Sequence, residues 1–99
     1  MTTLNIAQTL DKNASWSTTF APSAPLAQSN PLVIDIAVTG DAEVTITDTV
    51  TGDVLALPDV ERPGGRIATT YDGHVSAGPF TLSISTVLGC TISGSLNFT

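Results

Sequence analysis

One stretch places an acid, a base and a hydroxyl close together: Asp72-Gly73-His74-Val75-Ser76, which holds the only histidine. In a catalytic triad these three side chains are the orienting acid, the base and the nucleophile, and they converge from separate segments. Neighbours at i and i+2 on one strand share a face but lie ~6–7 Å apart, too far for a proton relay. We therefore interpret the stretch as a turn followed by the start of a strand, and we expect no enzymatic activity.

Metal ligands are too few for zinc and more plentiful for calcium. A single cysteine and a single histidine fall short of the three or four nitrogen or sulfur ligands that zinc takes. Cys90 also has no partner for an intrachain disulfide, and we expect it to be a small buried side chain. Seven of the nine acids lie between positions 35 and 61, and Asp41 and Asp53 end two copies of a Val-Thr-Gly-Asp motif. We keep calcium, bound by such turn acids, as a candidate ligand and expect no other cofactor.

Three aromatic side chains form the candidate binding surface: Trp16, Phe20 and Tyr71. Exposed rings stack on sugars, so a carbohydrate-binding face is one hypothesis. The competing interpretation is that these rings fill the core, since aromatic residues make up only 5% of the chain. Thr45, Thr47 and Thr49 line one face of another segment, where threonine is an ordinary solvent-facing residue of strands and also a candidate ice-binding array.

Composition limits the kinds of domain and of partner that we expect for this chain. The 99 residues fit one domain, and 41% hydrophobic residues with a mean hydropathy of +0.28 suffice for a core. Charged residues are 12%, about half the usual share. The net charge is −6, and three basic residues (Lys12, Arg62 and Arg66) cannot build a phosphate-binding patch. We therefore expect neither nucleic acid nor an anionic membrane as a partner.

Targeting signals are not apparent in the sequence. The first residues lack a basic region followed by an apolar run, and no segment approaches the ~20 apolar residues of a membrane helix. We expect cytoplasmic synthesis without a signal peptide, followed by use on a virion or an extracellular surface.

The elements that must position these residues are strands, because apolar and polar residues alternate with period two. We expect strands over 2–10, 14–20, 32–38, 42–50, 54–57, 66–71, 78–87 and 90–98, and no helix. About eight short antiparallel strands indicate a single β-sandwich over 1–99, either Ig-like or jelly-roll. Residues 1–31 form an N-terminal arm or an edge segment, 21–31 a proline-rich link, and 58–65 an exposed loop.

The predicted turns indicate which strands follow one another as hairpins. The two Val-Thr-Gly-Asp motifs, twelve residues apart, predict a meander that uses one turn twice. Asp72-Gly73 and Leu88-Gly89 read as further hairpin turns. Asp48 shares the apolar face of 42–50, whereas Asp35 is expected to face outward.

After Asp72 the chain carries no further acid, lysine or arginine. Long uncharged strands invite pairing when they lie at a sheet edge, so the last strands are either central or paired with another copy. We expect both arrangements to contribute, and hence a homo-oligomer or larger assembly. The leading functional hypothesis is a structural virion component, such as a capsid decoration, spike or tail protein. The alternative is a carbohydrate- or cell-surface-binding module, with or without calcium.

Overall fold

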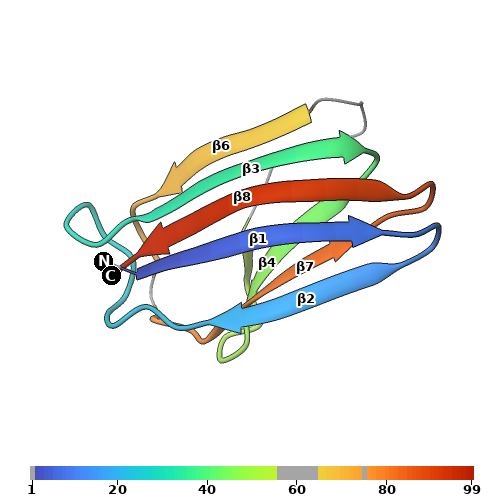
Figure 1. The fold of residues 1–99 in the computed structure, drawn as a ribbon. Helices are drawn as coiled ribbons and strands as arrows, with labels where there is room; N and C mark the ends of the chain where they lie inside the picture. The colour runs from blue at the N-terminus through green and yellow to red at the C-terminus, as the bar shows by residue number, and fades with distance from the viewer. Residues whose placement is uncertain (1, 56–64, 75) are drawn as a thin grey trace.

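A computed structural model describes residues 2–55, 65–74 and 76–99, which form two four-stranded antiparallel sheets with no helix among them (Figure 1). The first sheet has the order β1-β8-β3-β6 and the second β2-β7-β4-β5. The strands are β1 (Thr2–Leu10), β2 (Ser15–Phe20), β3 (Leu32–Gly40), β4 (Glu43–Asp48), β5 (Val54–Leu55), β6 (Gly65–Tyr71), β7 (Phe80–Ser85) and β8 (Cys90–Phe98). The predicted all-β sandwich of eight short antiparallel strands is confirmed. The predicted loop over 58–65 lies outside the described residues except for Gly65.

The strand order decides between the two predicted sandwich types. β1 pairs with β8, β2 with β7, β3 with β6 and β4 with β5. The chain is thus one long hairpin, doubled at the β4–β5 turn and rolled into two sheets, which is the jelly-roll arrangement. An Ig-like sandwich has a different strand order, with its first two strands adjacent in one sheet.

The predicted connectivity was mostly wrong. The first Val-Thr-Gly-Asp motif, at 38–41, carries the chain from one sheet to the other, and only the second, at 50–53, closes a hairpin. Asp72-Gly73 and Leu88-Gly89 also lie in connections between sheets, since β6 and β8 belong to one sheet and β7 to the other. Glycine lets the chain turn sharply, but the same turn chemistry serves a hairpin and an inter-sheet connection.

The core lies between the sheets and consists of the inward-facing residue of each alternating pair. On β3 these are Leu32, Ile34, Ile36 and Val38, none more than 1% exposed. Phe20, Phe80 and Phe98 form an aromatic group at one end, with ring centroids 5.5 Å apart for Phe20–Phe80 and 5.1 Å for Phe20–Phe98. Cys90 is buried as predicted, and burial raises the pKa of its thiol.

The outer face of the first sheet carries one ion pair. Asp35 faces outward, as predicted, and accepts two hydrogen bonds from the Arg66 guanidinium, at 2.8 Å from Nε and 2.7 Å from an Nη. The Arg66 guanidinium lowers the pKa of Asp35. Both side chains are largely exposed, so this pair contributes little to stability.

The two uncharged C-terminal strands are both central. β8 lies between β1 and β3, and β7 lies between β2 and β4 (Figure 1). The N-terminal strands β1 and β2 occupy the edges beside them. Among the described residues, the uncharged strands at sheet edges are therefore β1 and β2 rather than β7 and β8.

Candidate functional site

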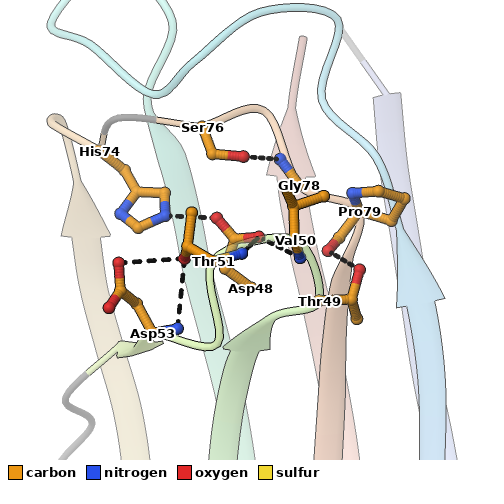
Figure 2. Close-up of polar contacts among 9 residues, drawn as sticks. All are labelled: Asp48, Thr49, Val50, Thr51, Asp53, His74, Ser76, Gly78 and Pro79. Atoms are coloured by element: carbon orange, nitrogen blue, oxygen red, sulfur yellow. Dashed lines mark hydrogen bonds and ion pairs between the residues drawn. The ribbon is translucent and has the colours of Figure 1, made fainter.

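The most organised polar group in the structure is centred on Asp48, the last residue of β4. Asp48 is completely buried, and the Nε2 of His74 donates to its Oδ2 at 2.7 Å. Its Oδ1 accepts the backbone N–H groups of Val50, at 2.8 Å, and Thr51, at 3.2 Å. Figure 2 shows the carboxylate between the imidazole and the β4–β5 turn. One carboxylate thereby closes this turn and fixes the segment that follows β6.

The local sequence explains why a carboxylate is placed there. Period two puts Asp48 on the inward face with Val44 and Ile46, directly before the tight turn at residues 49–52. Aspartate at that position satisfies N–H groups of the turn that the strand ladder leaves free. Gly52 has a positive φ of 81°, and its N–H bonds the carbonyl of Asp48 at 2.8 Å.

Pro79 and His74 take part in further hydrogen bonds at this end of the sandwich. The Thr49 backbone N–H and hydroxyl both donate to the Pro79 carbonyl, at 2.9 and 2.7 Å. The backbone N–H of His74 donates to the Leu26 carbonyl at 3.0 Å, and its ring lies 5.5 Å from that of Phe80. Three connections, β2–β3, β4–β5 and β6–β7, are thus joined at one end of the sandwich (Figure 1).

The electrostatics favour the ionised form of Asp48. Burial alone would raise its pKa, but hydrogen bonds from His74, from the N–H groups of Val50 and Thr51 and from Ser76 outweigh burial and lower it strongly. A buried carboxylate with this many donors is a stable anion.

Asp72, His74 and Ser76, which we did not interpret as a catalytic triad, do not act together as one group. His74 and Ser76 both act on Asp48, which comes from a different strand, and Asp72 is not among the groups that bond it. The Ser76 hydroxyl also accepts the N–H of Gly78 at 3.0 Å (Figure 2). A relay needs the base between acid and nucleophile, whereas here the acid lies at the centre of all the donors. The signal in the sequence was a carboxylate on the apolar face of 42–50.

A second aspartate organises the opposite end of the sandwich. Asp41 Oδ1 accepts the Leu88 N–H and the Thr86 hydroxyl, both at 3.0 Å, and its Oδ2 accepts the Val87 N–H at 3.3 Å. Burial would raise the pKa of Asp41, but these donors together lower it. The result is a fixed β7–β8 connection whose Val87 and Leu88 side chains are 63% and 71% exposed.

Replacing Asp41 with alanine is expected to lower the melting temperature by about 5–10 °C, because the Val87 and Leu88 N–H groups lose their acceptor. The Thr86 hydroxyl keeps the backbone carbonyl of residue 41, to which it donates at 2.7 Å. Asp11→Ala removes the same charge from the neighbouring β1–β2 connection and is the matched control, for which we expect a change below about 2 °C. Thermal unfolding followed by circular dichroism measures both. Equal effects of the two substitutions would contradict the role assigned to Asp41.

The three aromatic candidates do not lie on one exposed face. Phe20 is 5% exposed and belongs to the core. Trp16 and Tyr71 are partly buried and pack against the same core from β2 and β6, which belong to different sheets. Trp16 also lines a shallow hollow of about 270 Å³ along β2 and β7, together with Ser15, Ser17, Ser83, Ile84 and Ser85.

Asp41 and Asp53, the candidate calcium ligands, lie at opposite ends of the sandwich, since β4 separates their turns. Asp53 instead accepts the Thr51 hydroxyl at 3.0 Å. Within 2–55, 65–74 and 76–99 no cluster of three acidic, histidine or cysteine side chains is arranged to hold a metal ion.

The outer faces of both sheets consist mainly of small uncharged side chains. Across β2, β7 and β4 the rows are Ser15-Ser85-Glu43, Ser17-Ser83-Thr45 and Thr19-Thr81-Thr47. Across β1, β8 and β3 the rows are Thr3-Asn97-Val33, Asn5-Ser95-Asp35, Ala7-Ser93-Ala37 and Thr9-Thr91-Thr39. Thr49, expected beside Thr45 and Thr47, lies in the turn instead. These faces present hydroxyl and amide groups with few charges.

Comparisons of the chain with protein-family models, curated proteins and solved structures found no match. The part of the chain that the structure describes holds no helix long and apolar enough to cross a membrane.

Proposed function

We propose that this protein is a non-catalytic structural component that works by assembly, and that the assembly is a virion in which it serves as a decoration, spike or tail protein. The observation that carries the proposal is the jelly-roll strand order, an architecture used by viral capsid domains and by lectins. A shared architecture does not by itself establish a shared function, so the proposal also rests on the outer surface and on the hydrogen bonds of the two aspartates.

The surface supports association rather than chemistry. Rows of serine, threonine, asparagine and alanine cover much of both sheets, and such faces cost less free energy to bury than charged faces when their hydroxyl and amide groups find hydrogen-bond partners. The acidic residues concentrate on β3, β4 and the connections that follow, which leaves β1, β2, β7 and β8 without charge.

The hydrogen bonds of Asp48 and Asp41 support a structural role as well. Asp48 accepts hydrogen bonds from the β4–β5 turn and from His74 of the β6–β7 connection, and Asp41 accepts several from the β7–β8 connection at the other end. Their donors are used in holding turns, and the single histidine is engaged with Asp48.

The proposal predicts that the purified protein self-associates as its concentration rises. Multi-angle light scattering across a dilution series and electron microscopy of the concentrated sample measure this directly. A monomer at every concentration would contradict the proposal. A glycan array is the parallel test of the carbohydrate-binding alternative, in which binding that is lost in Trp16→Ala would favour the hollow along β2 and β7.

A further inference from the structure

The charges of this protein are segregated by strand. β1, β2, β7 and β8 contain no acidic or basic residue, whereas β3, β4 and β6 carry Asp35, Glu43, Asp48 and Arg66. Because β1 and β8 are neighbours in one sheet and β2 and β7 in the other, the neutral strands make up one lateral half of the sandwich (Figure 1). A second copy can approach this half without bringing like charges on the strands together, despite a net charge of −6.

β1 is the longest edge of that neutral half. It pairs with β8 along all nine residues without a bulge, from Thr2↔Phe98 to Leu10↔Cys90. Among the described residues no segment pairs with its other side, so its outward N–H and C=O groups form a free row. Proteins usually protect such an edge with charge, proline or a bulge, and β1 has none of these.

The remaining edges differ from β1. On the same sheet, β6 carries Arg66, which is paired with Asp35. In the second sheet, β5 is two residues long and β2 is six. A long, regular and uncharged edge is therefore specific to β1.

The side chains of β1 suit a second copy of the same strand. Its outer face carries Thr3, Asn5, Ala7 and Thr9, which are small and tolerate one another as cross-strand neighbours. On its inner face Leu4 and Leu10 are only partly buried and would be covered by the same residues of another β1. Two identical strands that pair antiparallel are related by a two-fold axis, the commonest symmetry of homo-oligomers.

We infer that β1 pairs antiparallel with β1 of a second copy, so that the sheet β1-β8-β3-β6 continues across a two-fold axis into the sheet of the partner. The inference rests on the proposed function, for which it names the first contact of assembly. Backbone hydrogen bonds between the two β1 strands provide the affinity, and the uncharged outer rows set no barrier to approach.

The test places lysines on the edge and compares them with lysines one strand further in. Asn5→Lys with Ala7→Lys puts two charges on the outer face of β1, where the two copies would meet. Thr91→Lys with Ser93→Lys puts the same charge on the same face, on β8. Each double variant reduces the net negative charge equally, which by itself favours association. Circular dichroism confirms that each variant is folded.

We expect the edge variant to weaken self-association by about tenfold or more, and the β8 variant by less than about threefold. In the wild-type protein, hydrogen exchange at β1 amides should slow as concentration rises. Equal weakening of both variants, or of neither, would overturn the inference and leave assembly through another surface. A wild-type monomer at all concentrations would overturn the inference and the proposed function together.

Discussion

Asp48→Ala is expected to lower the melting temperature by roughly 15 °C, because it removes at once the buried acceptor of the His74 hydrogen bond and of two turn N–H groups. His74, only 9% exposed in its side chain, would lose its partner. The turn at residues 49–52 would lose the acceptor that fixes it. Thermal unfolding followed by circular dichroism measures the change.

The control for Asp48 is another acid of the same turn. Asp53→Ala removes one negative charge at an exposed position, where the carboxylate accepts the Thr51 hydroxyl and no other donor among the described residues, and should lower the melting temperature by less than about 5 °C. His74→Gln keeps a side-chain N–H donor and should fall between the two. A loss for Asp53→Ala as large as for Asp48→Ala would mean that charge, and not the buried contacts, sets the stability of this end.

Asp48 also makes the stability of the protein depend on pH, with a sign that follows from its lowered pKa. The pKa of Asp48 is lower in the folded protein than in the unfolded chain, so the folded state gains stability from Asp48 wherever the unfolded carboxyl is ionised. That contribution is complete above the unfolded pKa and is lost as the pH falls below about 4. Wild-type stability should fall steeply in acid, and the Asp48→Ala variant should show a smaller fall, since Asp35 and Asp41 still contribute in the same direction.

The second large effect is expected at Gly94, in the middle of β8. Its φ is +152°, and a Cβ placed there would overlap the Asp35 carbonyl oxygen and lie 2.8 Å from the Ile36 Cα. Both atoms are backbone of β3, so the central strands would have to separate. We expect Gly94→Ala to destabilise the protein by about 3–5 kcal/mol, measured by urea unfolding.

Substitutions at two other glycines distinguish backbone conformation from close packing as the cause of the destabilisation by Gly94→Ala. Gly52 has a φ of +81° but open space around an added Cβ, so Gly52→Ala should cost about 1 kcal/mol for backbone conformation alone. Gly73 has open space and no such φ, and Gly73→Ala should change stability by less than about 0.5 kcal/mol. If Gly94→Ala cost no more than Gly52→Ala, close packing of β3 on β8 would not explain Gly94.

Strands were predictable from this sequence because alternation is a local property. Thr2–Leu10 and Cys90–Phe98 match the predicted ranges, and the inward and outward faces of β3 follow from the period-two pattern. The buried position of Asp48 was readable in the same way. Its partner was not, because His74 lies 26 positions after Asp48, beyond β5, β6 and a change of sheet that no local pattern specifies.

The predicted connectivity was wrong for a related reason. Gly40 and Gly52 both adopt positive φ in the same four-residue motif, yet one connection changes sheet and the other does not. The choice is made by burial of the whole strand against the opposite sheet, a long-range effect. The same holds for the uncharged C-terminal strands, whose central places depend on the N-terminal strands that flank them.

The doubling of the chain at the β4–β5 turn determines when this protein can fold. Thr2 pairs with Phe98 and Ser15 with Ser85, so the first strands of this sandwich to be translated depend on the last ones for their neighbours. While β7 and β8 are still being translated, β1 and β2 have no ladder to join, and contacts of such large sequence separation form slowly. The nascent chain therefore carries β1 and β2 unpaired until β7 and β8 have been translated, and the sandwich closes only after translation has passed β8.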